Sequence, residues 1–90
     1  MNSTDKPVPN PIVVLREDFD DLSVLYNPDT ADAIGINPIG AAIWKQMDGR
    51  RTVSEIIAHL RASYADVPDT VTDEIIAFID GLARKGFARV

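Results

Sequence analysis

The side chains that could carry out catalysis are few in this sequence of 90 residues. There is one histidine, His59, and no cysteine, which excludes thiolate nucleophiles, iron–sulfur clusters and cysteine zinc sites. No second ligand stands at metal spacing from His59, and there is no glycine-rich phosphate loop or nucleophile elbow. We therefore expect a protein that is not an enzyme, with no catalytic residues, no metal site and no cofactor.

The charge and hydropathy of the chain limit the classes of partner that it is expected to bind. A formal net charge of −5 repels phosphate, which disfavours nucleic acid and anionic membranes as partners. No stretch approaches the roughly 18 apolar residues that span a bilayer, and the N-terminus lacks the apolar stretch of a signal peptide. We expect a soluble, cytoplasmic protein whose partner is a basic or apolar peptide.

The length and composition predict one folded domain with a short lead-in. Hydrophobic residues make up 46% of the chain and charged residues 26%, which is ordinary globular usage. The polar stretch 1–11 carries prolines at positions 7, 9 and 11, which favour an extended backbone. We predict a disordered N-terminal tail over 1–11 and a folded domain over 12–90.

The first half of that domain reads as three strands. Residues 12–16 are short and β-branched, residues 22–26 form a second extended segment, and residues 31–36 return after a turn at Asn27 and Pro28. In the third strand the period of two places Ile34 and Ile36 on a core side, with small residues on the other side. Three consecutive strands predict a minimal antiparallel sheet with two open edges.

The second half reads as three helices, which gives an α+β fold. Asn37 followed by Pro38 is a typical helix start, and the first helix should run to about Met47. Thr52 and Glu55 have the spacing of a capping box, so a second, amphipathic helix begins there. His59 falls on the solvated face of that helix.

The third helix should begin near Pro68 or Asp69, run to Lys85 and stop at Gly86. Its apolar residues form a narrow stripe for the core and a shoulder beside it, which is wider than core packing requires. Either the sheet covers the shoulder, or an incoming peptide does so while pairing with the edge of the third strand. The stripe comprises Val71, Ile75, Phe78 and Leu82, and the shoulder comprises Ile76, Ile79 and Ala83.

A DNA-binding regulator of the winged-helix type is the alternative function. Arg50 and Arg51 adjoin the turn between two short helices, as in helix-turn-helix readers. The third helix would be the recognition helix, yet Asp73 and Glu74 in its first turns would face phosphates. The electrostatics therefore disfavour this alternative.

Four short motifs resemble one known family. They are Val-Leu-Tyr-Asn-Pro at 24–28, Ile-Asn-Pro-Ile-Gly-Ala-Ala-Ile-Trp at 36–44, Asp-Gly-Arg-Arg-Thr-Val at 48–53 and Gly-Phe at 86–87. In this order they resemble the PqqD family, the peptide chaperones of pyrroloquinoline quinone synthesis and founders of the precursor-peptide recognition domains. The resemblance spans about residues 13–87.

The resemblance implies a winged helix-turn-helix-like domain that does no chemistry itself. Such a domain captures the leader of a ribosomally made precursor peptide and presents it to a modifying enzyme, typically a radical S-adenosylmethionine protein. The pathway is either quinone synthesis or that of another modified peptide. An open strand edge also allows a weak homodimer beside the monomer. The implied peptide-binding residues are Asp32, Ala33, Ile34, Gly35, Ile36, Ile75, Ile76, Ile79, Leu82 and Ala83.

Overall fold

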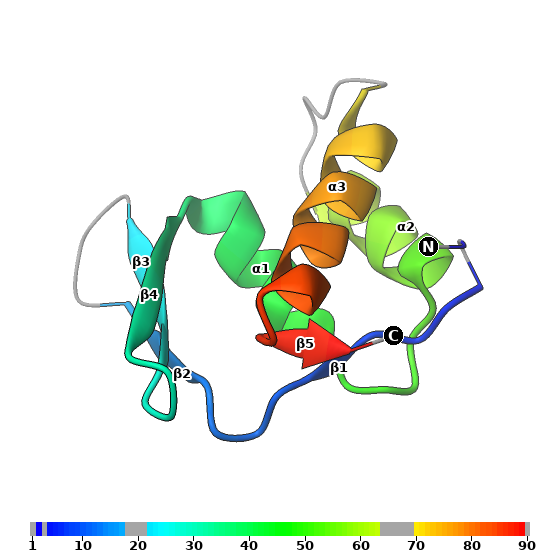
Figure 1. Cartoon of the computed structure of the whole chain (residues 1–90). Helices are drawn as coiled ribbons and strands as arrows, with labels where there is room; N and C mark the ends of the chain where they lie inside the picture. Colours follow the sequence, from blue (N-terminus) through cyan, green and yellow to red (C-terminus); the bar gives the residue numbers. More distant parts are fainter. Residues whose placement is uncertain (1, 3, 18–21, 64–69, 90) are drawn as a thin grey trace.

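A computed structural model of the chain describes residues 2, 4–17, 22–63 and 70–89. It contains a three-stranded sheet, three helices, and a small ribbon made from the two ends of the chain (Figure 1). This is the α+β fold predicted from the sequence. In chain order the elements are β1 (Val8–Pro9), β2 (Val14–Arg16), β3 (Ser23–Asn27), β4 (Asp32–Ile36), α1 (Pro38–Gln46), α2 (Val53–Ser63), α3 (Val71–Arg84) and β5 (Ala88–Arg89).

The three-stranded sheet is antiparallel in the order β2-β3-β4, which confirms the predicted strands. Leu25 of β3 lies opposite Ile34 of β4, so their side chains share the face that packs on the helices. The turn between these strands is closed locally, because the Asn27 side chain accepts a hydrogen bond from the Asp29 amide at 2.9 Å. Ala31 completes the turn in the left-handed region, with φ of 61°.

Both predicted helix starts are confirmed by their hydrogen bonds. The Asn37 side chain accepts a bond from the Gly40 amide at 2.8 Å and caps α1. At the start of α2 the Thr52 hydroxyl accepts from the Glu55 amide at 3.1 Å, and the Glu55 carboxylate accepts from the Thr52 amide at 3.0 Å. This is the reciprocal capping box, which satisfies two backbone donors that a helix start leaves free.

The end of α3 also follows the sequence prediction. Gly86 takes φ of +78°, the Gly86 amide donates to Ala83 O at 3.2 Å, and the Phe87 amide donates to Leu82 O at 2.9 Å. These two bonds form a Schellman motif, which turns the chain back over the last helical turn. Phe87 is completely buried as a result. The predicted start near Pro68 and Asp69 lies outside the described residues.

The N-terminal segment differs from the predicted disordered tail. Val8 lies opposite Arg89 in the antiparallel β1–β5 ribbon, and the Asn10 amide donates to Phe87 O at 2.9 Å. On the opposite edge, Pro7 O accepts from the Gly49 amide at 3.1 Å and Asp5 O accepts from the Val53 amide at 2.9 Å. The ordered structure therefore begins well before residue 12, and it connects β5 to the turn between α1 and α2.

Proline spacing explains why this segment can be a strand. Pro7, Pro9 and Pro11 stand at every second position, and the backbone groups of a strand alternate between its two edges. Since Asn10 bonds to the β5 side, the missing N–H groups of the prolines fall on the other side. On that other side Pro7 takes part only as an acceptor, through its carbonyl, so its missing N–H costs no hydrogen bond. The prolines that suggested disorder are compatible with an edge strand.

Candidate functional site

The free edge of β4 is the first component of the candidate site. In the described part of the chain, β4 pairs with β3 along one edge and with no strand along the other. Such an edge presents a row of unpaired backbone N–H and C=O groups, which can pair with another extended chain. Figure 1 shows α1 between the sheet and α3, so the end of β4 leads directly into the helical half.

The two faces of β4 have different surroundings. Ile36 is buried and Ile34 is half-buried against the core, as the period of two predicted. Ala33 and Gly35 are exposed on the opposite face. A Cβ added to Gly35 would lie 3.2 Å from Cδ1 of Leu22, so this glycine leaves room for the Leu22 side chain. Space beside Gly35 is thus already occupied by the protein itself.

The buried stripe of α3 differs from the predicted one at one position. Ile75, Ile79 and Leu82 have exposed fractions of 1%, 0% and 2%, so they belong to the core together with Val71. Phe78, which the sequence placed in the stripe, is half-buried instead. Ile79 therefore replaces Phe78 in the core, and it is not part of an accessible shoulder. The observed core residues are spaced by 4, 4 and 3 positions along the helix, and the predicted ones by 4, 3 and 4. Both spacings keep the residues on one face of a helix, so the periodicity alone does not choose between them.

One flank of α3 faces α2. The Arg61 guanidinium of α2 donates to the Thr72 hydroxyl of α3 at 3.3 Å. At about 100° per residue, Ile76 and Ala83 lie on the same flank as Thr72. Both are half-buried there. Of the predicted peptide-binding residues on α3, these two are accessible, but they lie toward α2 rather than toward β4.

The other flank of α3 carries Phe78 and faces the junction of β4 and α1. A Cβ added to Gly40, in the first turn of α1, would lie 3.1 Å from the Ile36 Cβ and 3.4 Å from Phe78 Cζ. Gly40 is therefore required for close packing of three elements at this point. This junction, rather than the Ile76 flank, brings β4 and α3 together. We call the side of α3 that carries Phe78 the Phe78 flank.

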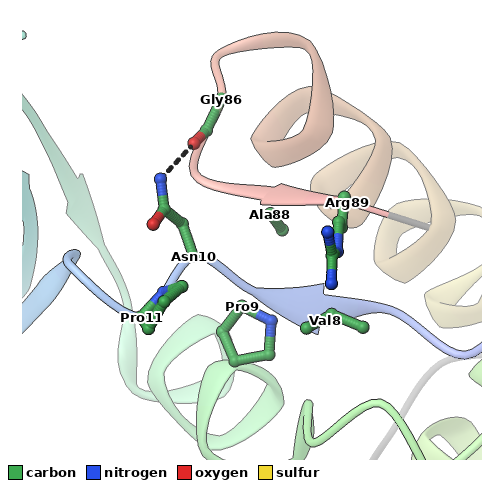
Figure 2. A pocket seen from close by; sticks show the side chains of 7 residues that line it. All are labelled: Val8, Pro9, Asn10, Pro11, Gly86, Ala88 and Arg89. Carbon is green, nitrogen blue, oxygen red and sulfur yellow. Dashed lines mark hydrogen bonds between the residues drawn. The ribbon is translucent and has the colours of Figure 1, made fainter.

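A pocket of about 400 Å³ lies at the β1–β5 ribbon (Figure 2). The Asn10 side chain crosses it, donating from Nδ2 to Gly86 O at 3.0 Å and accepting from the Ile12 amide at 3.2 Å. These bonds connect the end of α3 to the approach to β2. We call this set of contacts the Asn10 link. The pocket is lined by Val8, Pro9, Asn10, Pro11, Gly86, Ala88 and Arg89.

The perturbed carboxylates lie in caps and turns rather than in a reactive cluster. Backbone hydrogen bonds from Arg51 and Arg50 lower the pKa of Asp48, in the turn after α1. Two hydrogen bonds with Thr52 lower the pKa of Glu55: the larger effect comes from the backbone of Thr52 and the smaller from its side chain. His59 is exposed on α2, as predicted. Within the described ranges, no three His, Cys, Asp or Glu residues converge as a metal site requires.

None of the helices in the described part of the chain combines the length and apolar character that a membrane crossing needs. The described surface offers the free edge of β4 and the Phe78 flank of α3. An open strand edge is one to which an extended chain can add as a further strand.

Comparison with known proteins gives the family. The family model of Coenzyme PQQ synthesis protein D (PqqD) matches residues 23–88, and the chain belongs to this family. The match covers β3, β4, all three helices and the first residue of β5. In comparison with the curated proteins, no sequence match is found.

A solved structure is similar over nearly the whole chain. It is described as TbiB1 in complex with the TbiA(beta) leader peptide. The two chains are 26% identical, with a TM-score of 0.73, and the match covers 90% of this chain and 93% of the other. This likeness extends beyond the family match to the N-terminal part of the domain.

Two features of the structure, one at the site and one at the β1–β5 ribbon, differ from the sequence prediction. Phe78 was assigned to the core because it fits the helical period as well as its neighbour Ile79 does. Asn10 was assigned to a disordered tail, although prolines at every second position also fit an edge strand. The alternation of the prolines was the available signal.

Proposed function

We propose that this protein binds the leader of a ribosomally synthesised precursor peptide and presents it to a peptide-modifying enzyme. The observations that carry the proposal are the free edge of β4 and the close approach of Ile36, at the end of β4, and Phe78 of α3 over Gly40. Similarity to a protein whose structure holds a leader peptide supports it. In this proposal the domain itself catalyses no step.

The leader joins the sheet as a strand beside β4. Backbone groups of residues 32–36 pair with the leader backbone, which gives affinity for many sequences. Alternate leader side chains then point toward the helices, where Phe78 supplies an apolar contact. Ile36 and Gly40 form the base of this contact, because they pack beneath Phe78.

The α3 residues implied by the family resemblance have different parts in this proposal. Ile75, Ile79 and Leu82 hold α3 in place from within the core, because they are buried. Ile76 and Ala83 lie on the flank toward α2 and contribute indirectly. A flexible leader loses conformational entropy on ordering, so we expect a dissociation constant of roughly micromolar order.

The partner that receives the leader is a radical S-adenosylmethionine enzyme or another peptide-modifying enzyme, in quinone synthesis or in the synthesis of another modified peptide. This assignment rests on the family. The proposal places the encounter in the cytoplasm, where ribosomes make precursor peptides, and takes the domain to be a monomer or a weak homodimer.

An NMR titration tests the proposal. Isotopically labelled protein is titrated with leader peptides encoded beside its gene, and amide shifts are followed along the chain. We expect shifts concentrated in β4 and on the Phe78 flank of α3. A leader carrying N-methyl groups at alternate backbone nitrogens is the matched control, since it cannot pair as a strand and should bind at least tenfold more weakly.

Two results would contradict the proposal. Shifts confined to the β1–β5 ribbon or to α2 would place the partner elsewhere. A salt-dependent response to duplex DNA, with none to any leader, would favour the winged-helix regulator instead.

A further inference from the structure

Gly81 occupies a position in α3 where neither packing nor backbone geometry requires glycine. α3 spans 14 residues, Val71–Arg84, and Gly81 lies within its hydrogen-bonded turns. Beyond its chain neighbours and the backbone of its own helix, a Cβ built on Gly81 would meet no atom within 4 Å, whereas one on Gly40 would meet three. Positive φ angles occur at Gly49 and Gly86 among the described glycines, not at Gly81. In a helix interior, glycine lowers the folding constant roughly fivefold relative to alanine, so its presence at Gly81 needs another reason.

The position of Gly81 on the helix suggests that reason. At about 100° per residue, Gly81 lies roughly 60° from Phe78 around the helix and roughly 140° from Ile76. It is therefore on the Phe78 flank, about one turn closer to the end of α3. Glu74 and Lys85 fall on the same flank and are exposed. The missing side chain leaves open space about one helical turn from a half-buried aromatic ring.

We infer that Gly81 is a specificity-determining position that admits a large apolar side chain of the leader against Phe78. The inference rests on the proposed function and adds a side-chain preference to it. An aromatic or branched aliphatic residue fits, because it gains contact area with the ring while the glycine presents no side chain in its way. Backbone pairing along β4 supplies general affinity, and the open space at Gly81 selects among leaders.

The test uses substitutions whose effects on stability and on binding have opposite signs. Gly81→Ala should raise the thermal midpoint by a few degrees, because it removes the helix penalty without creating a clash. It should also weaken leader binding about threefold, and Gly81→Leu should weaken it at least tenfold. Ala58→Leu, at an exposed position of α2, is the control for added surface bulk.

A double-mutant cycle identifies the leader residue. Each large apolar residue of the leader is replaced in turn by alanine, and binding is measured to wild-type protein and to Gly81→Leu. We expect one leader position at which the two changes are not additive, because both remove the same contact. If Gly81→Leu binds every leader as tightly as wild type does, the inference is wrong although the proposed function stands. If wild type binds no leader, the proposed function itself fails.

Discussion

The β1–β5 ribbon and β4 lie at two ends of this domain, and they differ in whether both edges of the strand have pairing partners. At the β1–β5 ribbon, backbone groups on both sides of the N-terminal segment have partners: the Asn10 amide donates to Phe87 O on one edge, and Gly49 and Val53 donate to carbonyls along the other. At β4, one edge pairs with β3 and the other pairs with no strand of the described chain. We call these the closed end and the open edge. The difference teaches that the presence of pairing partners on both sides separates a closed strand from one that can still accept a further strand.

This contrast also separates stability from binding. The closed end connects the N-terminus, the turn between α1 and α2, and the end of α3, so its contacts are made entirely within the protein. The open edge leaves backbone groups of β4 unpaired by any strand of the described chain, and under the proposed function these groups pair with the leader. Substitutions should therefore divide into those that change the free energy of unfolding and those that change leader affinity.

The largest expected effect comes from the core beneath both regions. Ile79→Ala should lower the free energy of unfolding by about 2–5 kcal/mol, because it leaves a cavity at a completely buried position. Denaturant unfolding measures the loss. Ile76→Ala, at a half-buried position of the same helix, is the control and should cost less. The affinity of the folded Ile79→Ala protein for the leader should be unchanged. A loss of affinity with unchanged stability would show that Ile79 is a binding residue and not a core residue.

A smaller effect, on binding, is expected at the open edge. Phe78→Ala should weaken leader binding about tenfold, or roughly 1.4 kcal/mol, because the aromatic surface beside β4 is removed. Titration calorimetry measures the change. Ile76→Ala on the flank toward α2 should stay within twofold of wild type. Equal losses for both variants would erase the distinction between the flanks.

At the closed end, the Asn10 link should contribute to stability alone. Asn10→Ala removes the bonds to Gly86 O and from the Ile12 amide, which should lower the free energy of unfolding by about 1 kcal/mol. Thermal unfolding measures this change. Asn10→Asp is the informative companion, since it keeps the acceptor for Ile12 but loses the donor to Gly86. A drop in leader affinity with intact stability would connect the closed end to binding.

The smallest expected effect is the pH dependence of two carboxylates, one in the turn after α1 and one in the cap of α2. Hydrogen bonds hold the pKa values of Asp48 and Glu55 below their ordinary values of 3.8 and 4.5. Their contribution to stability is therefore present above those values and is lost as the pH falls through the lowered ones. Glu55→Gln should be slightly less stable than wild type at pH 7, and this difference should shrink by pH 3. A constant difference across that range would show that charge at Glu55 has no part.

Local rules predicted much of the fold. Asn37, the Thr52–Glu55 pair and Gly86 were assigned from sequence because each acts on backbone groups within a few residues. The three strands followed from β-branched runs and turn residues in the same way. These signals are short-range, and the structure confirms them.

The errors concern choices that depend on distant residues. Phe78 and Ile79 are adjacent and apolar, and which of them enters the core is decided by Gly40 and α1, about 40 residues away in the chain. The N-terminal segment is ordered because Phe87, Gly49 and Val53 provide bonding partners that no local rule reveals. The free edge of β4 was predictable as an edge, but the flank of α3 that faces it was not.

Because Val8 pairs with Arg89, the two ends of the folded domain lie side by side, and this affects how the domain can be joined to another protein. Paired strands lie about 5 Å apart, so the polypeptide enters and leaves the fold at nearly one point. A host protein could therefore accept the whole domain as an insertion at a single surface turn, with little displacement of its own backbone. Since entry and exit belong to the closed end, such an insertion would leave the free edge of β4 available for pairing.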